Sequence, residues 1–66
     1  MKDRIRIRRL TLRKTQKQLA TALGMKSANT IANWESGLRT PPTKILSQLA
    51  DELEVSLDFL LNGREV

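Results

Sequence analysis

The stretch TQKQLATALGMKSANTIANWESG, residues 15–37, contains the start and stop signals of two short helices. Thr15 and Gln18 have the spacing of a capping box, in which each side chain bonds to the backbone N–H of the other residue. Apolar residues then recur along one helical face until Gly24, a residue type common just after helix ends. We therefore expect a helix over 16–23 with Thr15 as its N-cap.

The second helix of this stretch is expected over 28–36. Ser27 is of the type that caps helix starts, and Gly37 is of the type that follows helix ends. Ile31 and Trp34 form its apolar side. Two short helices joined by a tight turn form the arrangement whose second helix enters the major groove of DNA.

Three further helices are expected outside this stretch. They are residues 4–13 with Asp3 as N-cap, the segment 45–53 with its apolar period of three to four, and residues 57–61 with Ser56 as N-cap. Arginine and isoleucine alternate over 4–8 as in a strand, but a lone strand would have no partner in this chain. The patterns predict an all-α fold of five short helices, forming a single domain over 1–66.

Composition removes several classes of site. The chain contains no cysteine, histidine or tyrosine, which excludes disulfides, histidine-based triads and most zinc sites. No apolar run approaches the ~18–20 residues of a membrane span, and no apolar segment of the signal-peptide kind follows the basic start. We expect a cytoplasmic binding module that implies no metal, cofactor or small-molecule ligand.

Positive charge is concentrated in one half of the chain. Residues 1–26 hold nine of the twelve Lys and Arg residues and a single acid, Asp3, whereas residues 27–66 hold six acids. Such a basic half is typical of proteins that bind a polyanion, most often nucleic acid. The alternative is a solvated helix face. Trp34 and Phe59 are the only aromatic residues, too few for the stacking platforms of single-strand binders.

The chain contains a series of motifs in the order and spacing of a known family. They are Thr15-Gln16-x-x-Leu19-Ala20, Gly24, Ile31-x-x-Trp34-Glu35-Ser36-Gly37, Pro41, Leu49-Ala50-x-x-Leu53 and Val55-Ser56-Leu57-Asp58-Phe59-Leu60-Leu61. Together they resemble the phage repressor and Cro-type helix-turn-helix family, which is lambda-repressor-like and of the XRE type. The resemblance covers about residues 4–63. It implies a compact five-helix fold and a sequence-specific regulator of transcription that binds double-stranded DNA.

Three positions depart from the family pattern. Met25-Lys26 stands where the family usually has one apolar residue, and we place the additional residue in the turn before Ser27. Arg13-Lys14 stands where the family favours a glycine and an apolar residue, and Glu54 stands where a glycine is common. These departures affect the turns more than the fold.

The resemblance implies that the outward face of the 28–36 helix contacts DNA bases. Asparagine can pair with N6 and N7 of adenine, and alanine can touch the methyl group of thymine. Without the resemblance, polar residues would be expected on any solvent-facing helix. The base-contacting candidates are Ala28, Asn29, Ala32 and Asn33 of this helix and Gln16 at the start of the 16–23 helix. For Gln16 the resemblance implies a contact to the backbone or to the adjacent base, and the alternative is a merely exposed polar residue.

Basic and hydroxyl side chains around that face are expected to contact the DNA phosphates. The free N–H groups at the start of the 16–23 helix would favour such an anion. For the arginines, a merely solvated side chain is the alternative. The phosphate-contacting candidates are Thr15, Lys17, Thr30, Arg39, Thr40, Lys44, Arg8 and Arg13.

The resemblance also implies a structural ion pair between Arg9 of the first helix and Glu35 of the third. A two-point guanidinium–carboxylate contact would join these helices. The two residues of this ion pair are expected to be partly buried. The core should contain Trp34, Leu19, Leu23, Leu46, Leu49 and Leu53.

A homodimer is expected, at least on DNA. One chain offers one recognition helix, and two chains about a two-fold axis would double the number of base contacts. The apolar C-terminal segment is the expected interface, through Val55, Leu57, Leu60 and Leu61. The alternative is that these residues belong to the core.

Several functions compete at this stage. A phage- or prophage-type repressor or Cro-like switch protein acting on an inverted-repeat operator leads. An antitoxin-like protein-interaction module that also regulates its own gene is second, although only Arg64-Glu65-Val66 follow Gly63. Binding to nucleic acid through charge alone is third. An enzyme is the weakest, because nothing pairs the seven carboxylates with a nucleophile or a set of metal ligands.

Overall fold

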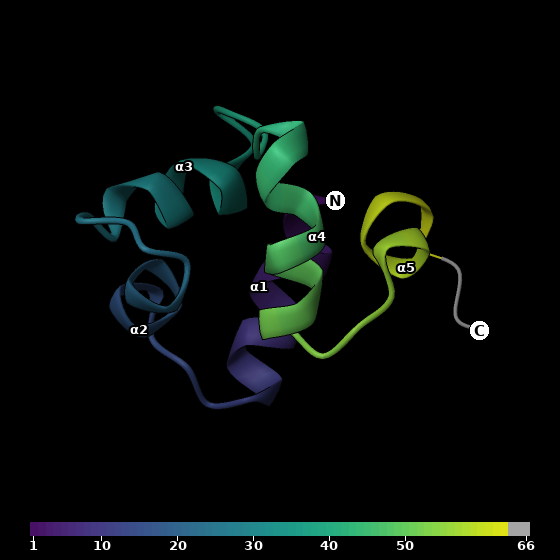
Figure 1. The fold of residues 1–66 in the computed structure, drawn as a ribbon, viewed down its shortest axis with the longest axis horizontal. Coiled ribbons are helices and arrows are strands. Elements are labelled where there is room, and N and C mark those ends of the chain that lie inside the picture. Colours follow the sequence, from purple (N-terminus) through teal and green to yellow (C-terminus); the bar gives the residue numbers. More distant parts are fainter. Residues whose placement is uncertain (64–66) are drawn as a thin grey trace.

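The computed structural model describes residues 1–63, which form five helices and no strand. The helices are α1 (Lys2–Thr11), α2 (Gln16–Ala22), α3 (Asn29–Ser36), α4 (Thr43–Glu52) and α5 (Leu57–Asn62). In Figure 1, α2 and α3 lie on one side of the pair formed by α1 and α4, and α5 lies on the other side. The expected all-α fold with five helices is confirmed. Residues 64–66, which follow Gly63 and were weighed for the antitoxin-like role, lie outside the described residues.

α1 begins and ends two residues earlier than the 4–13 helix expected from the sequence. Its N-cap is Met1, whose carbonyl accepts the N–H of Ile5 at 3.1 Å, so Asp3 lies within the first turn instead of capping it. The helix ends because Arg13 has a left-handed φ of 57°. The N–H of the next residue, Lys14, then reaches back to the carbonyl of Arg9 at 3.0 Å.

Three helices end in this way, with one left-handed residue and an N–H that reaches five residues back. The left-handed residues are Arg13 after α1, Gly24 after α2 and Glu54 after α4, with φ values of 57°, 75° and 57°. The family resemblance gave glycine as the usual residue at 13 and 54. Glycine adopts a positive φ without a clash at Cβ, so both departures fall on backbone that disfavours the side chains present.

α2 begins at the expected residue, and its capping box is confirmed. The N–H of Gln18 donates to the hydroxyl oxygen of Thr15 at 3.0 Å, and the N–H of Thr15 donates to Oε1 of Gln18 at 2.8 Å. The helix ends at Ala22 with Leu23 as its C-cap, one residue before the expected end.

The helix α3 begins at Asn29, one residue later than expected. Ala28 is its N-cap, and Ser27 acts from the preceding position, where its hydroxyl oxygen accepts the N–H of Asn29 at 3.1 Å. Met25 and Lys26 both lie in the turn between α2 and α3. Met25 packs against the core, whereas Lys26 is exposed.

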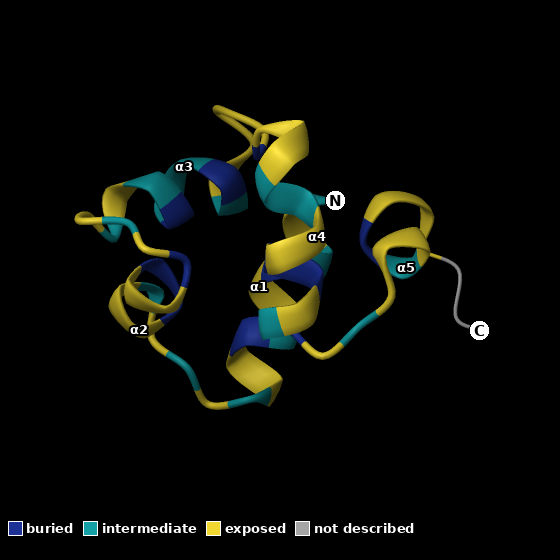
Figure 2. Cartoon of the chain, viewed as in Figure 1, coloured by how far each residue is buried: buried dark blue, intermediate teal, exposed yellow. Residues whose placement is uncertain are grey.

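The core lies where the helices converge (Figure 2). It consists of Ile5, Leu19, Ala20, Leu23, Ile31, Trp34, Leu49, Ala50, Leu53 and Leu60. Leu46, which was expected among them, is partly buried and packs against this cluster. Leu60, which was expected at a dimer surface, has 0% of its surface exposed and belongs to the core instead. α5 buries it as the inward side chain of a short helix.

Basic side chains of the N-terminal half cap the C-terminal ends of α4 and α5. Arg4 donates from Nε to the carbonyl of Leu60 and from Nη2 to that of Leu61, both at 3.1 Å. Arg8 Nε donates to the Leu53 carbonyl at 3.2 Å, and Lys14 Nζ donates to the Glu52 carbonyl at 3.1 Å. Part of the positive charge noted in the sequence therefore stabilises the fold. Within 1–63, no helix has the length and apolar character needed to cross a membrane.

Candidate nucleic-acid interface

The polar face of α3 is formed by two adjacent stripes of residues. Asn29, Asn33 and Ser36 are spaced by four and three positions, so they share one side of the helix. Asn29 and Ser36 are exposed and Asn33 is half-buried. Ile31 and Trp34 occupy the opposite side, inside the core. The asparagine amides are therefore carried on the solvent side of a short, anchored helix.

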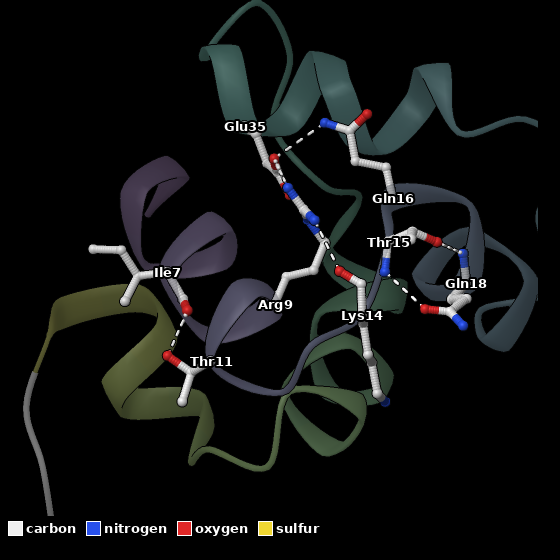
Figure 3. Close-up of polar contacts among 8 residues, drawn as sticks. All are labelled: Ile7, Arg9, Thr11, Lys14, Thr15, Gln16, Gln18 and Glu35. Atoms are coloured by element: carbon white, nitrogen blue, oxygen red, sulfur yellow. Dashed lines mark hydrogen bonds and ion pairs between the residues drawn. The ribbon is translucent and has the colours of Figure 1, made fainter.

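The second stripe consists of Ala28, Ala32 and Glu35, with the same spacing of four and three. Both alanines are half-buried. Glu35 is the one long side chain of this stripe, and it points away from solvent towards α1 and α2 (Figure 3).

Basic and hydroxyl side chains lie on both sides of α3. Lys17 of α2 is exposed, and its Nζ donates to the carbonyl of Lys26 in the turn at 3.3 Å. On the other side, Arg39, Thr40 and Lys44 are exposed in the loop after α3 and in the first turn of α4. The N–H of Arg39 donates to the carbonyl of Asn33 at 3.2 Å, which holds this loop against the end of α3.

The remaining phosphate candidates differ in how free their side chains are. Arg13 is exposed, and Thr30 is half-buried on α3. The hydroxyl oxygen of Thr15 accepts the N–H of Gln18, which leaves its own O–H as a donor. Arg8 is instead bonded to the end of α4, as described above, so its guanidinium serves the fold through at least one of its N–H groups.

Arg9 and Glu35 form a buried two-point ion pair between α1 and α3 (Figure 3). Arg9 donates from Nε to Oε2 of Glu35 at 2.6 Å and from Nη2 to Oε1 at 2.9 Å. A third donor of the same guanidinium, Nη1, lies 2.9 Å from the carbonyl of Lys14. The side chains of Arg9 and Glu35 are 9% and 6% exposed, so water screens this contact little.

Burial of Glu35 opposes its charge, but hydrogen bonds from Arg9 and Gln16 and the nearby charges of Arg9 and Arg6 outweigh this effect. The pKa of Glu35 is therefore lowered. The hydrogen bond to Glu35 raises the pKa of Arg9, against the effect of burial and with the help of the carboxylate charge. Both residues are charged at neutral pH.

Gln16 is the third member of this network. Its Nε2 donates to Oε1 of Glu35 at 3.2 Å, which connects the first residue of α2 to the last turn of α3 (Figure 3). The sequence predicts a DNA contact for Gln16 and does not indicate this bond. The two residues are 19 positions apart on different helices, so no periodicity relates them.

These features define a helix-turn-helix: α2 and α3 pack together across a short turn, and α3 carries polar side chains on its outer face between two basic flanks. A profile of the helix-turn-helix family matches residues 5–60. The chain belongs to this family, of the XRE type related to Cro and C1 proteins. No curated protein and no solved structure matches the chain.

Membership of this family makes the chain a DNA-binding regulator of the XRE type, with double-stranded DNA as its partner. The family consists of regulators and is not typically enzymatic.

Proposed function

We propose that the chain is a sequence-specific repressor or Cro-like switch protein of the phage or prophage type, which acts in the cytoplasm. It binds an inverted-repeat operator as a homodimer, with α3 of each chain in the major groove. Asn29 and Asn33 contact base edges together with Gln16, Ala28 and Ala32.

The observation that carries this proposal is the outer face of α3. Asn29 and Asn33 stand one helical turn apart on the same side, and each amide offers the donor and acceptor that match the N6 and N7 positions of adenine. Lys17 on one flank and Arg39 and Lys44 on the other supply the charge that fixes a protein on the phosphate backbone. Thr15, Thr30, Thr40 and Arg13 add further phosphate contacts to this arrangement.

The dimer follows from the number of contacts that one chain can make. A single short recognition helix covers one half-site, and specific affinities of order 10⁻⁸ M or better need more. Leu57 and Leu61 support an interface on α5, because they remain 41% and 39% exposed and lie one helical turn apart. Val55, which is half-buried, borders them in sequence.

Selection of bound sites from random duplex DNA tests the proposal. An enriched inverted repeat is the expected result. Enrichment of no sequence would reject specific regulation and favour either binding through charge alone or a role that depends on a protein partner. The observation that favours a protein partner is the exposure of two apolar side chains of α1, Ile7 and Leu10, which have 60% and 52% of their surface exposed.

Titration onto the selected palindrome and onto its isolated half-site then tests the dimer. We expect two chains per palindrome and much weaker binding to the half-site. A Leu57→Ser, Leu61→Ser variant should lose this difference while retaining its helical signal, because both side chains are at the surface. Equal affinity of the unchanged protein for both duplexes, with one chain on each, would exclude the dimer.

A further inference from the structure

The basic residues of α1 leave the helix on two different sides. Arg4 and Arg8 are spaced by four positions, and their guanidinium groups bond to backbone carbonyls at the ends of α5 and α4. Lys2, Arg6 and Arg9 are spaced by four and three positions, so they share another side of the helix. This second basic side points away from the ends of α4 and α5.

The second basic side of α1 is turned towards α3. Arg9 points from it to Glu35, in the last turn of α3 (Figure 3). Burial opposes the charge of Glu35, but hydrogen bonds and nearby charges, that of Arg6 among them, lower its pKa. Arg6 therefore lies close to the C-terminal turn of α3.

Lys2 crosses the end of α3. Its Cδ and Nζ atoms lie 3.1 and 3.5 Å from the position that a Cβ at residue 37 would occupy. Gly37 is the C-cap of α3 and begins the loop that carries Arg39 and Thr40. The Lys2 ammonium group is therefore placed beside the loop that forms one basic flank of α3.

The charges of Lys2 and Arg6 are not used in ion pairs of the fold. Both residues are exposed, and the ion pairs found within residues 1–63 involve only Arg9 and Lys14 as their cations. Like charges four positions apart repel each other on a helix, so Lys2 and Arg6 stand one turn apart at some cost. An anion that bound both residues would remove this repulsion.

The acid of α1 does not neutralise this side. Asp3 is four positions from Ile7 and so shares the side of the helix from which Ile7 points. Figure 3 shows Ile7 pointing away from Arg9 and Glu35. The exposed side chains next to α3 on this part of α1 are thus cationic.

We infer that Lys2 and Arg6 bind the phosphate backbone of DNA and extend onto α1 the basic flank formed by Arg39 and Lys44. This inference rests on the proposed function, because it takes the outer face of α3 as the face turned towards DNA. Phosphate oxygens are the acceptors and the negative charges that two adjacent cations require. Among the arginines of α1 it favours Arg6 over Arg8, whose guanidinium bonds to the end of α4.

Affinity titrations at several salt concentrations test this inference with the unchanged protein and the Lys2→Gln and Arg6→Gln variants. Each substitution removes one positive charge and keeps a long side chain of good helix propensity. Each should lower the slope of log affinity against log salt by about 0.9, so its loss of affinity should shrink about 3.5-fold between roughly 50 and 200 mM salt. The losses should be equal on a selected site and on a random duplex, because phosphate contacts carry no sequence information.

Gln48→Glu is the matched control for net charge. It changes the net charge by the same amount at an exposed position of α4, and the slope should stay close to that of the unchanged protein. Melting temperatures measured on the same variants address the structural alternative, in which Lys2 and Arg6 only stabilise the carbonyl end of α3. Lower melting temperatures with unaltered slopes in both variants would establish that alternative and overturn the inference.

The two proposals fail in different ways. Enrichment of no sequence from random duplex DNA would reject the proposed function, while the slopes on a random duplex would still decide whether Lys2 and Arg6 contact the backbone. An enriched inverted repeat together with unaltered slopes in Lys2→Gln and Arg6→Gln would reject this inference alone. Both side chains are exposed, so we expect both variants to fold.

Discussion

Arg9 and Glu35 face each other with two parallel N–H···O contacts, and this pair is the most buried charged contact in the described part of the chain. It joins α1 to the last turn of α3. Since Ile31 and Trp34 anchor the other side of α3 in the core, the recognition helix is held from two directions. Its outer face therefore has a fixed orientation relative to α1 and the core.

Replacement of one member of this pair should lower the free energy of unfolding. Arg9→Met leaves the Glu35 carboxylate buried without its partner, and the loss is expected to approach the ~3–5 kcal/mol typical of broken buried pairs. Thermal unfolding followed by circular dichroism measures it. Arg6→Met is the matched control, because Arg6 is exposed on the same helix and its removal should change the free energy of unfolding little.

The Arg9→Met, Glu35→Leu double variant completes a thermodynamic cycle with the two single variants. We expect strong coupling, with the double variant more stable than the sum of the single losses predicts, because apolar side chains can replace a buried pair at little cost. Additive losses would contradict the energetic link between the two residues.

Stability should depend on acid through Glu35. Its pKa is lower in the folded chain than in the unfolded chain, so its contribution is complete above the ordinary glutamate value of about 4.3 and is lost as pH falls through the lowered pKa. The pKa of Arg9 is raised, so Arg9 stays charged over this pH range and its titration removes no stability. The difference in melting temperature between the unchanged protein and Glu35→Gln should therefore be constant from pH 7 to about 5 and narrow at lower pH. A constant difference down to pH 2.5 would contradict this.

Asn29→Ala and Asn33→Ala should each relax the preference at one or two base pairs of a half-site. A good bidentate contact contributes about 1–3 kcal/mol of discrimination, and non-specific affinity should change little. Competition titrations against cognate and random duplexes measure both quantities. Asn62→Ala on α5 removes the same kind of side chain from another helix and should leave both affinities unaltered. Equal losses on the two duplexes would show that the asparagines do not contact bases.

Lys17→Ala and Arg39→Ala should weaken binding to all sequences alike. Each phosphate contact releases counterions, so its loss should lower the slope of log affinity against log salt by about 0.9. Titrations at several salt concentrations give this slope. The Asn29→Ala variant should keep the original slope, which makes it the reciprocal control. An unaltered slope in both basic variants would remove these residues from the backbone contacts.

Glu54→Gly should stabilise the fold. Glu54 has a left-handed φ of 57°, which disfavours a side chain by about 1–2 kcal/mol, whereas glycine loses about 0.5–1 kcal/mol through the entropy of its unfolded chain. The expected gain in the free energy of unfolding is up to about 1 kcal/mol, measurable by denaturant titration. Gln48→Gly, in the interior of α4, should have the opposite sign. A loss of stability in Glu54→Gly would show that the Glu54 side chain contributes more than its backbone strain removes.

Local signals in the sequence were sufficient for part of this structure. The capping box of Thr15 and Gln18, the cap at Ser56 and the glycine after α2 each depend on residues within one helical turn, so their geometry follows from residue type and spacing. Such local signals were wrong at the end of α1, which they placed at residue 13 instead of Thr11. Arg13 has no intrinsic preference for the left-handed conformation that it takes, and only the packing of the whole fold selects it.

The contacts between distant residues were less accessible. The pairing of Arg9 with Glu35 was expected because of the family resemblance, and no feature of the residues alone indicates it. The bond from Gln16 to Glu35 and the capping of α5 by Arg4 join residues 19 and 56 positions apart. Such contacts depend on how helices are placed in space. The count of basic residues indicated a polyanion partner but could not separate arginines that cap helices from those at the DNA-binding face.

The bonds from Arg4 to the carbonyls of Leu60 and Leu61 join the first helix to the last, so they can form only after nearly all of residues 1–63 have been synthesised. These residues are separated by 56 and 57 positions, and ribosomes add about 5–20 residues per second, so the guanidinium of Arg4 waits roughly 3–11 s for its partners to be made. Leu60, the last core residue within 1–63, is made at the same moment. A nascent chain that ends before α5 therefore lacks both the apolar contact of Leu60 and the acceptors for Arg4.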